Sequence, residues 1–295
     1  MPVKLLYCEG GPRSADLRVL TALLAGVCVI KPGGSKYGFG QGIRFARMTS
    51  PARLGGMIAG LRDRDFDADD SPPVHAPRRW LVDNDTLWLG WYWERTEIEN
   101  YLVDPEVVGR ALGVRMPAAQ SYEAALRESA ESIAAYTAAR TALSVSRVRF
   151  SPLRNAWGKE RGTSGHLFPD QRTEADCRAA ICEILANYRD VQSVPTENVL
   201  DRFEALLLAC QPGGGRFMHF LTFFSGKDLL LGMQDGFVHL GLGTPGQFRE
   251  RILKGIEQAQ DDVWNWLRVE TNPEHSTDRE VMILARDRPA SPTDP

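Results

Sequence analysis

The stretch VKLLYCEGG at residues 3–11 decides the fold that we expect, because an apolar run stops at an acidic residue and two glycines. A short apolar run that ends in a glycine turn is typical of a buried strand. Ser14 and Asp16 come next, and both are residue types that cap a helix. Leucines then recur at helical spacing up to residue 24. The beginning of the chain therefore predicts a strand, a turn and a helix.

The same alternation continues beyond this first unit. A β-branched run at residues 27–30 precedes a glycine-rich stretch, and a helical pattern follows around residues 43–48. A third apolar run at residues 57–61 leads to the acidic pair at residues 63 and 65. This order is the pattern of right-handed βαβ units. We therefore expect an α/β, Rossmann-like and mostly parallel sheet, extended by a hairpin at residues 81–93.

The character of the sequence changes after about residue 115. Alanine-rich segments at residues 118–143, 174–188 and 197–209 have the period of helices. We therefore expect a sheet domain at residues 1–115, a mainly helical lobe at residues 116–285 and a disordered tail at residues 286–295.

The composition excludes several classes of protein. The chain has 295 residues, of which 43% are hydrophobic and 25% charged, and its formal net charge is −3. This is an ordinary globular mixture, so neither wholesale disorder nor a uniformly basic nucleic-acid coat is expected. The five cysteines form no CxxC pair, which disfavours a zinc site and suits a reducing compartment. Because the apolar runs are too short to span a bilayer, we expect a cytoplasmic protein with no membrane partner.

Acidic residues stand at the ends of the expected strands. Glu9 follows the first strand, Asp63 and Asp65 follow the third, and Glu97 and Glu99 follow the hairpin. Ligands of open parallel sheets bind outside the carboxyl ends of the strands, where these side chains would converge. Carboxylates suit Mg²⁺, which polarises a phosphate and activates water. Exposed turn residues, a strand edge or a helix start are the alternative interpretations.

Basic residues near the same edge are candidates for contact with a phosphate backbone. The segment at residues 140–161 has six basic residues against one acidic residue. We expect this segment and the glycine-rich stretch to line a nucleic-acid groove, although a solvated face or a partner-docking surface fits equally well. The candidate nucleic-acid contacts are Lys31, Lys36, Arg44, Arg64, Arg147 and Arg149.

Other motifs are less specific. Neither Gly158-Lys159 nor Gly226-Lys227 completes the phosphate-loop pattern, so we expect no ATPase activity in this chain. Lys227 either starts a helix as an exposed lysine or reaches the acidic site and stabilises phosphate charge. The tryptophans of residues 80–93 either stack on bases or pack in the core, and their alternation favours packing.

Three segments together resemble a known family. They are LYCEG at residues 6–10, GLRDRDFD at residues 60–67 and RTEIENYL at residues 95–102. This combination resembles the TOPRIM domain of topoisomerases, primases and OLD-family nucleases. It looks most like the stand-alone TOPRIM proteins of the DUF4435 type, which include the nuclease effector of PARIS-type anti-phage systems. The resemblance covers about the first 105 residues, and GKDLL at residues 226–230 resembles a late Gly-Lys motif of such proteins.

The resemblance implies metal-dependent phosphodiester chemistry. Glu9 would be a general acid/base or a metal ligand, and Asp63 and Asp65 would hold Mg²⁺ or Mn²⁺. Glu99 and Glu97 would complete the acidic site, with Lys227 as a further catalytic residue. In many relatives an acidic residue follows the glycine of the first motif more closely than Asp16 does here. The number of metal ions, one or two, therefore stays open.

We therefore expect a Mg²⁺-dependent nuclease that acts on RNA, with tRNA as the PARIS-like case, or on DNA. The resemblance also implies an antiviral toxin effector controlled by an ABC-like ATPase partner. A homodimer is a further candidate assembly. The alternative is a non-catalytic TOPRIM module that docks to nucleic acid or to an ATPase. Topoisomerase and primase activities are disfavoured, because no strand-passage segment or nucleotide-handling motif is evident.

Overall fold

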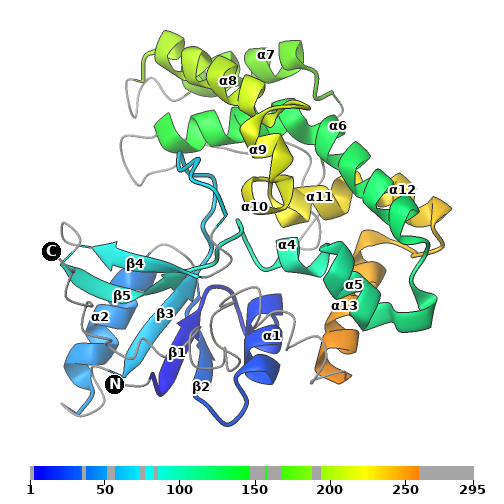
Figure 1. Cartoon of the computed structure of the whole chain (residues 1–295). Helices are drawn as coiled ribbons and strands as arrows, with labels where there is room; N and C mark the ends of the chain where they lie inside the picture. The colour runs from blue at the N-terminus through cyan, green and yellow to red at the C-terminus, as the bar shows by residue number, and fades with distance from the viewer. Residues whose placement is uncertain are drawn as a thin grey trace, which may run out of the picture.

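The computed structural model contains a five-stranded sheet with the strand order β2-β1-β3-β5-β4 (Figure 1). Strands β2, β1, β3 and β5 run parallel, and β4 pairs antiparallel with β5. The strands are β1 (Leu5–Cys8), β2 (Val29–Pro32), β3 (Ile58–Arg62), β4 (Arg78–Val82) and β5 (Leu87–Tyr92). The predicted mostly parallel α/β sheet and its terminal hairpin are therefore confirmed, and the arrangement is consistent with a Rossmann-like fold.

The structure describes most of the chain, and every structural statement below concerns these residues. They are residues 3–34, 38–51, 57–73, 77–82, 86–146, 157, 168–169, 171–187 and 194–258. The expected tail at residues 286–295 lies outside them.

Two crossover helices connect the parallel strands, and each packs in a different hydrophobic cluster. Helix α1 (Ala15–Leu23) starts at Ser14, whose hydroxyl accepts a hydrogen bond from the Leu17 nitrogen at 3.2 Å. Helix α2 (Phe39–Thr49) packs on β3 and β5. Leu6 and Cys8 of β1 are buried with α1, whereas Tyr7 packs in the cluster that contains α2. The two helices therefore cover opposite faces of the sheet, as the alternation of side chains along a strand requires.

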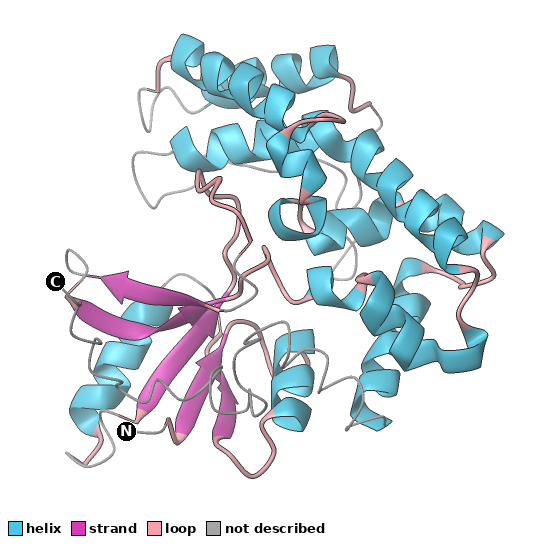
Figure 2. Ribbon diagram, viewed as in Figure 1, coloured by secondary structure: helices cyan, strands magenta, loops and turns pink. Residues whose placement is uncertain are grey.

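Helices are the other regular elements of the described chain, and Figure 2 shows them gathered beside and above the sheet. The predicted long helices are confirmed as α6 (Ala119–Ser146), α7 (Glu174–Asn187) and α8 (Thr196–Cys210). The shorter segments are α4 (Glu99–Leu102), α5 (Pro105–Leu112), the 3₁₀ turn η1 (Gly113–Arg115), α9 (Gly215–Met218), α10 (Phe220–Phe223), α11 (Gly226–Gly232), α12 (Gln234–His239) and α13 (Pro245–Gln258). No helix within the described ranges combines the length and apolar character needed to cross a bilayer.

One hydrophobic core joins the α1 face of the sheet to the helices. This cluster runs from Val3 in the first strand region to Ile256 in α13. α13 packs against both α1 and α5, and Arg18 of α1 pairs with Glu250 and Glu257 of α13. Helices α4 and α5 precede residue 115 in the chain, yet they pack against α11 and α13. The helical packing therefore begins before the boundary expected from composition.

The aromatic residues of the hairpin serve mainly to pack the sheet. Trp80, Trp91 and Trp93 are buried, and Trp80 stacks on Phe39 of α2 with ring centroids 5.7 Å apart. Arg62 lies over the Trp80 ring at 5.0 Å from its centroid. These rings are therefore occupied by protein contacts, as the favoured interpretation of their alternation predicts.

Candidate functional site

The carboxyl ends of β1 and β3 bring the first two predicted acidic residues together. The strands lie in register with Cys8 opposite Leu61, and the Glu9 nitrogen donates to the Leu61 carbonyl at 3.2 Å. The Glu9 carboxylate then accepts a hydrogen bond from the Asp63 nitrogen through Oε2 at 3.1 Å. Figure 1 shows β1, β3 and β5 pointing toward the helices that include α4 and α10. The site therefore begins at the edge where open α/β sheets bind their ligands.

The segment after β5 folds over this edge and carries the second pair of acids. The Thr96 carbonyl accepts from the nitrogens of Arg64 and Asp65 at 2.9 and 3.3 Å, and the Thr96 nitrogen donates to Thr222 at 3.1 Å. These bonds fix the chain between the sheet and α10. Glu97 and Glu99 are consequently buried, with 7% and 4% of their surface exposed. Neither is an exposed strand edge, whereas the other alternative, a helix start, does describe Glu99, the first residue of α4.

Helix α11 completes the site from the opposite side. Its Ser225 cap donates through Oγ to Glu97 Oε1 at 2.8 Å, and the Lys227 nitrogen donates to the same oxygen at 2.9 Å. The Lys227 ammonium pairs with Glu97 Oε2 and lies 3.4 Å from Glu99 Oε2. Lys227 therefore lies in the first turn of a helix and also reaches the acids, while its role toward a phosphate stays a prediction. Burial lowers the pKa of Lys227, but the charges of Glu97, Glu99 and Asp63 raise it well above its usual value overall.

Gly226 allows this close approach of α11 to α4. A Cβ atom there would lie 2.2 Å from the Asn100 nitrogen and 2.5 Å from the Glu99 carbonyl carbon. Asn100 ties the two elements further, since its side chain donates to the Phe224 carbonyl at 2.7 Å and accepts from the Glu97 nitrogen at 3.0 Å. A side chain at position 226 would push apart the groups that hold Glu97.

Asp16, whose role the sequence left open, belongs to the site. It is buried in the first turn of α1, where its Oδ1 accepts from the Trp93 indole nitrogen at 2.9 Å. Burial, followed by the negative charge of Glu99, raises its pKa to about 7. The sequence does contain a signal for this position, because Asp16 shares the buried face of an amphipathic helix with Val19 and Leu20.

The Asp63 carboxylate has a buried oxygen that a cation could bind. Its Oδ1 is buried and has no hydrogen-bond partner among the described residues. Burial raises the pKa of Asp63 well above its usual value, as do the charges of Asp16, Glu97 and Glu9, while Lys227 opposes the shift. A buried carboxylate in this setting must take up a proton or bind a cation.

The donor set fits a hard divalent ion such as Mg²⁺ or Mn²⁺, which prefers oxygen ligands. The Asp63 Oδ1 atom has an unused binding capacity, and the Lys227 ammonium already stands as a cation between Glu97 and Glu99. Within the part of the chain that the structure describes, no three acidic, histidine or cysteine side chains are grouped closely enough to hold one ion. The carboxylates are thus arranged around an ammonium group in this conformation.

Asp65 lies in the same turn but has a different backbone conformation. Its φ of 55° is in the left-handed region, which non-glycine residues seldom adopt. The Asp65 charge acts on Tyr92, whose pKa is raised first by burial and further by Asp67 and Asp65. Asp65 therefore lies in the turn after β3, close enough to Tyr92 of β5 for its charge to act on that phenol.

Arg64, a predicted nucleic-acid contact, is buried within the fold. Arg64 is only 7% exposed, and its guanidinium donates to Asp67 Oδ2 at 2.8 Å and to the carbonyls of Glu94 and Asp69 at 3.1 and 2.9 Å. It also lies over the Phe223 ring. These contacts occupy its donors inside the fold, so Arg64 holds the loop after β3 instead of a phosphate.

The other predicted basic contacts are more widely placed. Lys31 is exposed on β2, and Arg44 is half-buried on α2. Lys36, Arg147 and Arg149 lie outside the described residues. Of the described candidates for the groove, Lys31 and Arg44 keep exposed surface. They stand apart, because β2 is the edge strand beside β1 whereas α2 packs on β3 and β5.

Two arginines support the acidic site through contacts that no pattern in the sequence predicts. Arg249 of α13 donates to Glu99 Oε1 at 3.1 Å, although the two residues are 150 positions apart. Arg140 of α6 forms an ion pair with Asp228, which is 1% exposed and adjoins Lys227. Arg140 belongs to the segment that we expected to bind nucleic acid, yet it supports α11 from within the fold.

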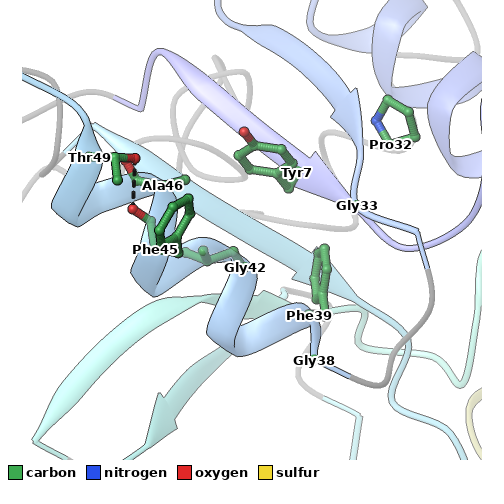
Figure 3. A pocket seen from close by; sticks show the side chains of 10 residues that line it. Tyr7, Pro32, Gly33, Gly38, Phe39, Gly42, Phe45, Ala46 and Thr49 are labelled. Atoms are coloured by element: carbon green, nitrogen blue, oxygen red, sulfur yellow. Dashed lines mark hydrogen bonds between the residues drawn. The ribbon is translucent and has the colours of Figure 1, made fainter.

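A separate pocket of about 400 Å³ lies on the α2 side of the sheet. Figure 3 shows Tyr7 of β1 and Phe39 and Phe45 of α2 around it. Among the described residues, its lining includes no carboxylate, histidine or lysine. Gly33 at its rim donates to the Cys8 carbonyl at 2.7 Å, which places the glycine-rich stretch beside the end of β1. The pocket itself has the chemistry of an apolar surface hollow.

Comparisons with known proteins add no assignment to this geometry. No model of a known protein family matches the chain, and no curated protein matches it.

Proposed function

We propose that this protein is a metal-dependent TOPRIM nuclease that uses Mg²⁺ or Mn²⁺ to cleave phosphodiester bonds in RNA or DNA. The observation that carries this proposal is the gathering of Glu9, Asp16, Asp63, Glu97 and Glu99 near Lys227 at the carboxyl edge of a parallel sheet. Such a concentration of buried carboxylates has a large electrostatic cost unless a cation is bound.

The residues suggest a division of roles. Glu9, Asp63 and the Glu97–Glu99 pair would hold the ion, which when bound supplies Lewis-acid polarisation and an activated water. Glu9 is placed to exchange a proton at its carboxylate, since it lies on the rim beside Asp63. Lys227 has a cationic end on a long side chain that suits the charge developing on a phosphate. The proposed antiviral role, tRNA preference and ABC-like ATPase partner rest on the resemblance alone.

The test is a cleavage assay with matched variants. Purified protein, alone and after co-expression with any ATPase encoded beside it, is incubated with tRNA, single-stranded RNA and plasmid DNA in Mg²⁺, Mn²⁺ or EDTA. We expect cleavage that needs the ion and falls by at least about 100-fold in Glu9→Gln and Asp63→Asn. Asp235→Asn is the control, because Asp235 is exposed on α12.

Equal cleavage by the wild type and both site variants would contradict the proposal and point to a contaminating nuclease. The alternative function is a non-catalytic module that docks to nucleic acid or to an ATPase. Ion-dependent binding of one of these, without cleavage under any of the conditions above, would establish that alternative in place of the nuclease.

A further inference from the structure

The contacts of Glu97 and Glu99 divide sharply between their two oxygens. The Oε1 atoms are held by donors that belong to the folded framework: Ser225 and the Lys227 backbone for Glu97, and Arg249 for Glu99. The Oε2 atoms of both residues face the Lys227 ammonium. One oxygen of each glutamate is therefore fixed in place, and the other is held by a single charged side chain.

The backbone of Lys227 is held firmly at the start of α11, whereas its side chain is held only through its ammonium group. Ser225 caps α11 and accepts from the Asp228 nitrogen at 3.3 Å, while Asp228 pairs with Arg140. These contacts fix the start of the helix. The Lys227 side chain, in contrast, is 56% exposed, although the glutamate side chains that it meets are 9% and 5% exposed. Because more than half of this side chain is open to solvent, the ammonium can leave the site without unfolding the helix.

We propose that Lys227 is a tethered cation that occupies the acidic site in the resting protein and must be displaced when a divalent ion binds. The inference rests on the proposed metal-dependent function and adds a form of regulation to that site. Departure of the ammonium exposes Glu97 Oε2 and Glu99 Oε2, and Asp63 Oδ1 already lacks a hydrogen-bond partner among the described residues. Three carboxylate oxygens on the inner side of the site then become available together, with their partner oxygens still held by the framework.

Displacement also explains why the carboxylates are not grouped as a ready metal cage. An ammonium is satisfied by separate contacts to two carboxylates, whereas a divalent ion needs its ligands at about 2.0–2.6 Å. The site would therefore tighten as the ion replaces Lys227. The released ammonium stays tethered beside the ion, where it can meet the phosphate of a substrate.

The experiment measures Mn²⁺ affinity by the loss of the free-ion electron paramagnetic resonance signal, with no substrate present. Lys227→Met removes the competing charge and should tighten Mn²⁺ binding by about tenfold or more, as expected for a unit charge a few ångströms away. Lys227→Arg keeps the charge and should bind Mn²⁺ within about threefold of the wild type. Lys254→Met changes the net charge equally at an exposed position of α13, and should leave the affinity unchanged.

Equal or weaker Mn²⁺ binding by Lys227→Met than by the wild type would overturn the inference, while the proposed metal site would stand. Absence of saturable Mn²⁺ binding in every protein, wild type included, would overturn the proposed function and the inference with it. A loss of function in this variant is not the readout, because a purely catalytic lysine would also produce one.

A second measurement uses the wild type and so does not depend on how a variant folds. Lysines are labelled briefly by reductive methylation, and the modification of Lys227 is followed by peptide mass spectrometry. Saturating Mg²⁺ should increase the labelling of Lys227 by about threefold or more and leave Lys254 unchanged, because an ammonium released from carboxylates reacts faster. Unchanged or reduced labelling of Lys227 would overturn the displacement.

Discussion

Substitution of Gly226 by alanine tests the close contact between α11 and α4 on which the site depends. The new methyl group would lie 2.2 Å from the Asn100 nitrogen and 2.5 Å from the Glu99 carbonyl carbon, both of them backbone atoms. Ordinary contact requires the two segments to move apart by about 1 Å. The bonds from Ser225 and the Lys227 nitrogen to Glu97, now 2.8 and 2.9 Å long, would then exceed the useful range for a hydrogen bond.

The expected loss follows from these two effects. Overpacking of this kind costs about 1–3 kcal/mol, and a hydrogen bond to a charged group contributes about 1.5–3 kcal/mol. Movement of the helix relieves the steric overlap but lengthens the hydrogen bonds to Glu97, so the two costs do not add in full. We therefore expect the free energy of unfolding to fall by about 2–5 kcal/mol. Urea denaturation with an unchanged m-value measures this loss.

Gly109→Ala is the matched control for this experiment. Gly109 lies within α5, and a Cβ there would meet no atom within 4 Å. Alanine at this position should raise the free energy of unfolding by about 0.4–1 kcal/mol, since it restricts the unfolded chain without strain. A loss in Gly226→Ala smaller than about 0.5 kcal/mol would refute the close approach, because that is the size of an ordinary surface substitution.

Two other predictions concern charges near the site. Asp16 has a pKa raised to about 7 by burial and then by Glu99, so the folded protein keeps a proton that the unfolded chain releases near pH 4. The free energy of unfolding of the wild type, relative to that of Asp16→Asn, should therefore fall as the pH rises from about 4 to about 7. Urea unfolding of both proteins at several pH values measures this difference, and a difference that does not change with pH would contradict the prediction. Arg140→Leu removes the ion pair with the buried Asp228 carboxylate and should lower the free energy of unfolding by about 3–5 kcal/mol, part of which the double variant with Asp228→Asn should restore. An equal loss in the single and double variants would show that Arg140 acts through packing alone.

The sequence predicts the sheet well because its signals are local. A short apolar run that ends in Glu9-Gly10 stops a strand, and the Ser14 cap starts a helix, whatever the remainder of the chain does. The long helices are predictable for the same reason, since alanine-rich periodicity persists over several turns in α6 and α8. Connection lengths then leave few ways to order the strands.

Only part of the site is predictable in this way. Glu9 and Asp63 meet because parallel strands end at one edge, which topology alone requires. The inward turn of Arg64 depends on Thr96, which is itself held by Thr222, 126 positions later in the chain. The contact of Arg249 with Glu99 likewise arises from helix packing. Such orientations are set by tertiary contacts between distant segments, and no local pattern encodes them.

The shared core of α1 and α13 has a consequence for the order in which the protein is assembled during its synthesis. Arg18 meets Glu257 across 239 positions, so the side of α1 that packs on α13 stays uncovered until α13 has left the ribosome. The Arg249 contact to Glu99 belongs to the same late helix. A nascent chain that stops before α13 already carries every acidic residue of the site, but it lacks the arginine that holds one of them. The site is therefore complete only after α13 has packed against α1 and α5.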